Sequence, residues 1–159
     1  MKKIIFLVFI VVGFNCFSQQ AVDNDKKAVL EKVNKFFEAL EKQDSVLYKS
    51  LVFTSGQIWV MRHQGDSVKQ SMRTFSDDIK RFNPQVVIQE RPLSYDVKIY
   101  NDVAIVWAPY TLSLSGKFSH CGIDVFTLIK VNQEWKIVNA TYTVEPDGCD
   151  AIKKEYHLN

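Results

Sequence analysis

The spacing of hydrophobic positions changes along the chain and separates a helical part from a strand-rich part. From about Asp25 to Lys42, apolar residues recur every three to four positions, which predicts an amphipathic helix. A short helix is expected from Asp44, its N-cap, to Leu51, and a third helix from Ser71 to Phe82, before Pro84. The residues expected on the buried face of the first helix are Val29, Val33, Phe36, Phe37 and Leu40.

The remaining apolar runs are typical of strands. They read QIWVMRH, VVIQE, YDVKIY, VAIVWAPYTLSLS, GIDVFTLIKV and EWKIVNATYTV. Asn101-Asp102 and Asn132-Gln133 are turn dipeptides that join the last four runs into two hairpins. Because the helices come first and an antiparallel meander follows, the pattern predicts an α+β fold rather than alternating α/β units.

The final hairpin carries most of the candidate chemistry. A two-residue turn at Asn132-Gln133 pairs Asp124 with Thr141 and His120 with Glu145. That face is apolar near the turn and polar at its other end, as expected for a pocket with a few converging polar groups. The opposite face is apolar nearly throughout. We therefore expect both faces of the sheet to be covered, one by helices and the other by a second subunit in a homodimer.

The first residues follow the layout of a secretory signal peptide. Met1-Lys2-Lys3 precedes an apolar run from Ile4 to Val12, and polar residues follow. We expect cleavage after Gln19, so that residues 1–19 are the signal and residues 20–159 form one domain of an exported, periplasmic or secreted protein. The apolar run is short for a bilayer, so no stable membrane insertion is expected after signal removal. Lipidation at Cys16 is the less favoured alternative, because the residues before it are a poor match for such a site.

The charge balance argues against two classes of partner. The chain has 20 Lys and Arg residues against 18 Asp and Glu residues. Lys2 and Lys3 leave with the signal and no acidic residue does, so 20 less these two gives 18 basic residues against 18 acidic ones. Nucleic acids and anionic membrane surfaces select basic footprints, and a formally neutral domain is expected to bind neither.

Two cysteines, Cys121 and Cys149, remain after the signal is removed. In an oxidising compartment they are a disulfide candidate, and the turn sequence from Glu145 to Gly148 can return Cys149 to the level of Cys121. Two free thiols are the main alternative. A metal site that adds His120 is disfavoured, because neighbours on a strand point to opposite faces and the spacing matches no zinc pattern. We expect no metal and no cofactor.

Several segments together resemble the nuclear-transport-factor-2-like superfamily, and within it the exported bacterial SnoaL-like and lumazine-binding-like domains. These segments are Trp107-Ala108-Pro109-Tyr110, residues 116–126, Trp135-Lys136-Ile137, Tyr142-Thr143 and Gly148-Cys149. The resemblance covers the whole domain after the signal. It implies a cone-shaped, cystatin-like α+β roll, in which N-terminal helices pack on a strongly curved antiparallel sheet with a pocket between them. Members include isomerases, dehydratases, cyclases, ligand binders and dimerisation modules, so the resemblance does not select a function.

The polarity of the hairpin suggests which residues reach the pocket. Ligand-binding candidates at the mouth and beneath it are Asp124, His120, Tyr110, Phe126, Trp107 and Trp59. As catalytic candidates, Asp124 and His120 are the two possible general bases, and partial burial would raise the pKa of Asp124. Each also has a structural interpretation, with Asp124 held by Thr141 and His120 ion-paired with Glu145.

Three functions are compatible with these residues. The favoured one is an exported, non-catalytic domain that binds an unknown small molecule in the pocket as a homodimer. The alternatives are a cofactor-free lyase or isomerase that uses Asp124 or His120 as base, and a structural dimerisation module. The sequence does not decide whether the chain is an enzyme. Binding is preferred because no catalytic motif of the superfamily matches residue by residue.

Overall fold

The computed structural model describes residues 14–147 and 149–156, with side chains described from residue 22 onward. Most of the expected signal peptide, and the side chain of Cys16, lie outside the described residues, so cleavage and export stay predictions. The helices are α1 (Phe14–Lys42), α2 (Ser45–Leu51), α3 (Phe75–Ile79) and α4 (Cys149–Glu155). The strands are β1 (Val52–Gln64), β2 (Ser67–Thr74), β3 (Ile88–Pro92), β4 (Asp96–Tyr100), β5 (Val103–Leu114), β6 (Lys117–Val131) and β7 (Glu134–Val144).

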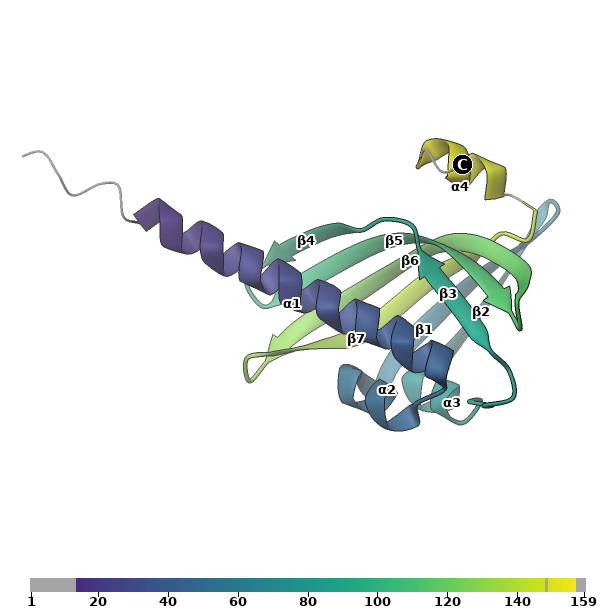
Figure 1. The fold of residues 1–159 in the computed structure, drawn as a ribbon, viewed down its shortest axis with the longest axis horizontal. Coiled ribbons are helices and arrows are strands. Elements are labelled where there is room, and N and C mark those ends of the chain that lie inside the picture. Colours follow the sequence, from purple (N-terminus) through teal and green to yellow (C-terminus); the bar gives the residue numbers. More distant parts are fainter. Residues whose placement is uncertain (1–13, 148, 157–159) are drawn as a thin grey trace, which may run out of the picture.

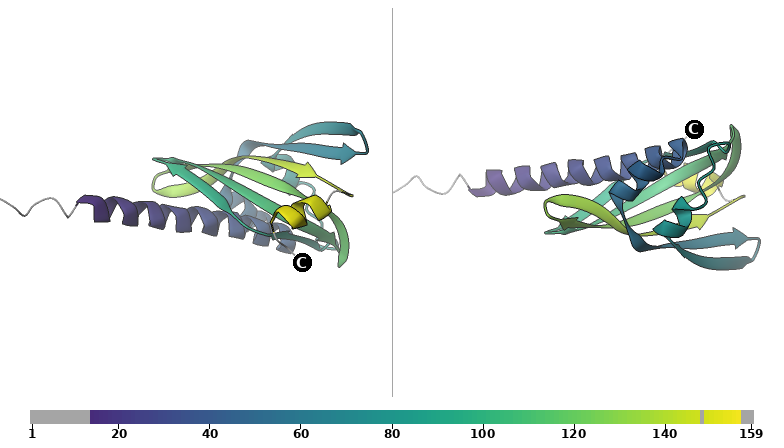
Figure 2. Two further views of the ribbon diagram at one scale, coloured as in Figure 1. Left: turned by 90° about the horizontal axis from the view of Figure 1, so that it is seen from above. Right: turned by 90° about the horizontal axis from the view of Figure 1, so that it is seen from below.

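The strands form one curved, open sheet, and α1 lies across its concave side with α2 and α3 near the C-terminal end of α1 (Figure 1). The strand order is β2-β1-β7-β6-β5-β3, with β4 also paired to β5. Figure 2 shows the curvature from two sides, with α1 following the hollow of the sheet. The predicted α+β roll is confirmed.

The sheet is mixed, whereas the sequence predicted a purely antiparallel one. β1 pairs in parallel with β7, from Val52 beside Ile137 to Arg62 beside Val144. Parallel neighbours need a long connection between them, and here the whole meander from β2 to β6 supplies it. The later hairpins are antiparallel, as the turn dipeptides predicted.

The apolar face of α1 forms the core with the sheet. Val29, Val33, Phe36 and Phe37 are buried, which confirms the periodicity of this helix. The rings of Phe36 and Phe37 meet Phe126 of β6 edge-on, with centroids 5.3 and 5.7 Å apart. Burial of large aromatic side chains is the main source of stability at such a contact, and it fixes α1 over β6.

Two helix boundaries differ from the prediction. Helix α1 is described from Phe14 onward, so it extends beyond the predicted start near Asp25. Asp25 lies inside the helix, where its carboxylate accepts hydrogen bonds from Lys130 Nζ (2.6 Å) and Trp135 Nε1 (3.2 Å). The predicted helix from Ser71 to Phe82 is wrong in its first part, since β2 continues to Thr74 in register with β1.

Both short helices are started by side-chain caps. Thr74 and Asp77 form a reciprocal capping box that begins α3 at Phe75. Asp44 caps α2 as predicted, with Oδ1 accepting from the amides of Val46 and Leu47, both at 2.9 Å. These caps place α2 and α3 side by side beneath the C-terminal half of α1 (Figure 1).

One extra residue in β7 changes the faces of the last hairpin. Leu128 lies opposite Ile137, but Thr127 lies opposite Asn139, so Val138 is a β-bulge. Beyond the bulge Asp124 faces Tyr142, and the predicted pair with Thr141 is wrong. Since successive side chains alternate, the bulge turns the buried face of β7 from odd to even positions, and the residues that reach the concave side beyond it are Ala140, Tyr142 and Val144.

The end of the β6–β7 ladder is irregular around Gly122. The Ile123 amide donates to the Thr143 hydroxyl (3.1 Å), and the Tyr110 hydroxyl donates to the Thr143 carbonyl (2.7 Å). A Cβ atom on Gly122 would lie 2.1 Å from that carbonyl oxygen and 2.9 Å from the Tyr110 ring. Glycine is therefore required here for close backbone approach.

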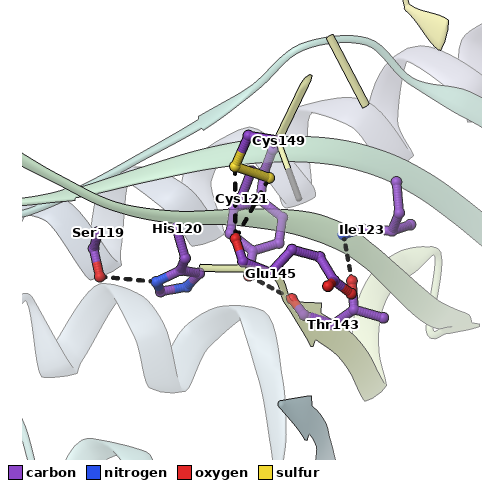
Figure 3. The surroundings of a disulfide bond; sticks show 8 residues. Ser119, His120, Cys121, Ile123, Thr143, Glu145 and Cys149 are labelled. Carbon is purple, nitrogen blue, oxygen red and sulfur yellow. Dashed lines mark hydrogen bonds between the residues drawn. A yellow bond between two sulfur atoms is a disulfide. The ribbon is translucent and has the colours of Figure 1, made fainter. Parts of the chain in front are cut away.

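A disulfide joins Cys121 to Cys149, as the cysteine count predicted, with Cα atoms 5.7 Å apart. Cys121 and His120 are neighbours on β6 and point to opposite sides of the strand (Figure 3). The bond therefore lies on the convex side of the sheet and tethers α4, which the sequence did not predict. The indole of Trp107 donates to the Tyr156 hydroxyl (3.1 Å) just beyond α4.

We predict that the exported protein carries this bond and needs it for full stability. The bond closes a loop with a sequence separation of 28 residues, and replacing both cysteines by serine should lower the free energy of unfolding by about 3–4 kcal/mol in the chain-entropy account. Mass analysis without reductant, on protein purified from the periplasm, should find no alkylatable thiol at either position. Two freely alkylated thiols would contradict the prediction.

Candidate functional site

A cavity of about 180 Å³ lies between the helices and the concave face of the sheet. Its apolar wall comes from α1, β1 and β6, through residues such as Phe36, Ile58 and Phe126. An engineered apolar cavity of about 150 Å³ in another protein accepts benzene, so this cavity has room for a ring-sized molecule. Its polar lining residues are Gln43, Arg62, Arg73, Asp78, Arg81, Glu90, Tyr110, His120, Asp124 and Tyr142.

Two carboxyl groups meet inside the cavity. Asp124 of β6 is 4 % exposed, and its Oδ2 atom has no hydrogen-bond donor among the described residues. Glu90 projects from β3, on the far side of β5, and the curvature of the sheet brings the two carboxyl groups within hydrogen-bond reach. A hydrogen bond between two carboxyl groups requires a proton on one of them, and that proton would satisfy the orphaned oxygen.

The environment of this pair raises both pKa values. For Asp124, burial, the charge of Glu90 and the hydrogen bond that protonated Asp124 donates to Glu90 raise the pKa well above its usual range. For Glu90, part of the residue is exposed but its carboxyl group is enclosed by protein, and this burial raises its pKa. Two nearby carboxylates that cannot both ionise share a proton and titrate as a pair.

His120 lines the same cavity, from the same face of β6 as Asp124, and is 8 % exposed. Burial, followed by the charge of Arg62, lowers its pKa to about 4, so the imidazole is neutral at neutral pH. Its Nδ1 atom is 2.9 Å from the hydroxyl of Ser119, the bulged residue of β6 (Figure 3). If Ser119 donates to Nδ1, the ring proton sits on Nε2, which is then a neutral donor.

Tyr110 lines the cavity with its ring, and its hydroxyl is not available to donate a hydrogen bond to a ligand. Its hydroxyl is used by the Thr143 carbonyl, and its ring meets the His120 ring edge-on at 5.8 Å. Burial raises the pKa of Tyr110, so it stays protonated in this setting. The contact holds the imidazole in one orientation at the cavity wall.

A second polar cluster closes the other side of the cavity. Arg73 of β2 is ion-paired with Asp78 of α3 and donates to the Tyr142 hydroxyl (3.1 Å). The hydroxyl of Tyr48, from α2, donates to the second Asp78 oxygen (2.9 Å). The cluster joins four separate elements, and its charges are compensated internally.

The structure brings together four of the six predicted ligand-binding residues. Tyr110, His120, Asp124 and Phe126 line the cavity. Trp59 and Trp107 do not lie beneath it: they are 38 % and 43 % exposed on the opposite, convex face, because their neighbours Ile58 and Ala108 take the inward positions.

The predicted contact between His120 and Glu145 is also wrong. The bulge at Val138 shifts the register, so Glu145 lies opposite Cys121 and its carboxylate is 3.4 Å from His63 Nε2. Sequence analysis missed Glu90, Arg73 and Arg81. Glu90 lies in the short strand β3, IQERP, whose sequence gives no sign of a partner on β6.

Among the described residues there is no cluster of three or more His, Cys, Asp or Glu side chains arranged to hold a metal ion. Within the same residues, no helix is long and apolar enough to cross a bilayer.

The fold is the α+β roll seen in solved proteins described as nuclear-transport-factor-2-like. More specifically, residues 24–143 match the family described as "Putative lumazine-binding", and the chain belongs to that family. No curated protein matches the chain.

Solved structures share the fold at low sequence identity. A nuclear-transport-factor-2-like superfamily protein from Salmonella enterica serovar Typhimurium is 16 % identical with a TM-score of 0.62, over 80 % of this chain and 95 % of that one. A protein from Shewanella baltica described as of unknown function is 18 % identical, TM-score 0.58, over 78 % and 96 %. A "putative dehydratase" from Streptomyces avermitilis is 17 % identical, TM-score 0.59, over 77 % and 96 %.

The raised pKa values predict how stability depends on pH. A carboxyl group whose pKa is raised in the folded state binds more protons there than when unfolded. Its contribution to stability is therefore lost as pH rises from about 4 through the folded-state values. Asp124→Asn removes one ionisation and keeps a donor for Glu90, so the variant should be more stable than the parent near pH 8 by at least about 1.4 kcal/mol.

Chemical denaturation at several pH values tests this prediction. The advantage of Asp124→Asn should shrink toward about pH 4, where both carboxyl groups of the parent are protonated. The matched control is Asp96→Asn, whose carboxylate lies on β4 with its side chain 66 % exposed, and it should show no such trend. A difference between Asp124→Asn and the parent that does not vary with pH would refute the shared-proton account.

Proposed function

We propose that this protein binds a small ring-shaped ligand in the cavity between α1 and the concave face of the sheet. The observation that carries the proposal is the buried Asp124–Glu90 pair, two carboxyl groups with raised pKa values inside a ring-sized cavity. A cavity with apolar walls and a few converging polar groups of perturbed pKa is typical of a ligand-binding site.

The carboxyl pair indicates the polar edge that such a ligand presents. A ligand edge that inserts between the two carboxyl groups can accept the proton of one and donate to the other, so the pair can supply a hydrogen-bond donor and an acceptor side by side. This matches a ring edge with adjacent N–H and C=O groups, as in cyclic imides and pteridine-diones. The family description, lumazine-binding, supports a heteroaromatic ligand of this kind.

A second candidate function is acid–base catalysis on the bound ligand. Asp124 and Glu90 have raised pKa values in a cavity that neutral His120 also lines, which suits proton transfer to or from a bound ligand. The similarity in fold to a protein described as a dehydratase favours keeping this lyase or isomerase alternative. Binding is preferred because no catalytic motif of the superfamily matches the chain residue by residue.

Export and self-association belong to the same proposal. The layout of residues 1–19 and the disulfide support an exported domain. On the convex face, Ile105 and Trp107 of β5 and Trp59 of β1 are between 38 % and 46 % exposed. An apolar face of this kind is commonly covered in a symmetric dimer.

Replacement of Asp124 separates binding from a purely structural role. Protein purified under native conditions should carry a small molecule that is detected by mass spectrometry after release. Asp124→Asn should weaken its rebinding at least tenfold, about 1.4 kcal/mol, because the amide cannot reproduce both a donor and an anionic acceptor. Asp96→Asn is the control and should bind as the parent does. Unchanged affinity in Asp124→Asn would contradict the role of the pair.

Light scattering tests the dimer. At micromolar concentration the domain without its signal should have twice the mass of a monomer of about 16 kDa, estimated from the usual mass per residue. Ile105→Lys, on the convex face, should shift the protein toward the monomer, whereas Lys42→Gln, whose side chain is 63 % exposed on α1 at the concave side of the sheet, should not. A monomer at all concentrations in the parent protein would contradict the proposal.

A further inference from the structure

We infer that the ligand carries a carboxylate, which binds to Arg62 and Arg81 at the mouth of the cavity while its ring points inward to Asp124 and Glu90. The inference rests on the proposed function and adds the charge and the orientation of the ligand.

Three arginines from different parts of the chain converge on this one cavity. Arg62 comes from β1, Arg73 from β2 and Arg81 from the turn after α3. Arg73 is compensated by its ion pair with Asp78. Arg62 and Arg81 are exposed, and within the described part of the chain neither has an Asp or Glu oxygen within 4.0 Å. Two guanidinium groups are thus available to an anion that enters from solvent.

The net charge of the residues that line the cavity indicates how many negative charges the anion carries. The positive charges are Arg62, Arg73 and Arg81, and the negative charges are Asp78 and the single charge of a carboxyl pair that holds one proton. His120 is neutral near pH 7 because burial lowers its pKa to about 4. One positive charge is left in excess, which favours a monoanion, and planar guanidinium groups match the geometry of a carboxylate.

The same charges determine the orientation of the ligand. The Glu90–Asp124 pair repels a second anion from the interior, whereas its proton and lone pairs suit a neutral polar edge. The positive charge of Arg62 acts on groups inside the cavity, since it contributes to the lowered pKa of His120. A carboxylate near Arg62 therefore lies at the mouth, and the neutral edge of the ring reaches the pair.

Two one-ring probes isolate the effect of the carboxylate. Uracil has adjacent N–H and C=O groups, and orotate (uracil-6-carboxylate) is the same ring with one carboxylate. Binding is followed by amide NMR shifts of Asp124 and Phe126 during titration of each probe into the full domain. Orotate should bind on the order of tenfold more tightly than uracil, because a partly exposed ion pair is screened but still attractive.

Charge variants then locate the preference. Arg62→Gln combined with Arg81→Gln should bring the two affinities to within about threefold of each other. Both side chains are exposed, so the fold should persist. Lys98→Gln removes the same kind of charge from a side chain that is 81 % exposed on β4, away from the cavity lining, and should keep the orotate preference.

The outcomes distinguish the two levels of the proposal. Equal binding of uracil and orotate to the parent protein would overturn the inferred carboxylate and leave the binding function in place. Orotate preference that survives in the double arginine variant would also overturn the inference, because the charge would then act elsewhere. Absence of any shift at Asp124 and Phe126 with both probes at millimolar concentration would contradict the proposed function itself.

Discussion

The β-bulge at Val138 is the constraint on which the arrangement of this cavity depends. Without the extra residue, the odd positions of β7 would continue to face inward, and Thr141 and Thr143 would line the hollow of the sheet. With it, Tyr142 and Val144 point inward beyond the bulge, and Tyr142 joins Arg73 of β2. Gly56 of β1 makes this possible, because a Cβ atom there would lie 2.3 Å from the Val138 carbonyl oxygen.

A second bulge, at Ser119 of β6, acts at the other end of the cavity. It places Ser119 beside His120 Nδ1 and leaves the even positions of β6, among them Asp124 and Phe126, facing α1. On the outer side of the same strand, Cys121 holds α4 through the disulfide. One strand therefore links a covalent tether on the convex face to the titratable groups on the concave face.

The sequence alone was sufficient to predict the fold class, but it predicted only part of the candidate site. Periodicity predicted α1 and its buried residues, and turn dipeptides predicted the hairpins, because these features depend on local chemistry. The cavity positions of His120, Asp124 and Phe126 followed from alternation within a single strand. The errors at Thr141, Glu145 and Trp59 arose where a bulge or a distant strand decides the face. No local pattern marks Glu90 as a partner of Asp124, since β5 lies between their strands.

The account centres on a proton shared by two buried carboxyl groups, and carboxyl ¹³C NMR during a pH titration measures it most directly. Asp124 and Glu90 should both have titration midpoints above the ordinary values of about 3.9 and 4.3, in two separated steps that belong to the pair. Asp124→Asn should reduce these to one step for Glu90. If both carboxyl groups titrate independently at their ordinary values in the parent protein, the shared proton and the ligand chemistry derived from it are contradicted.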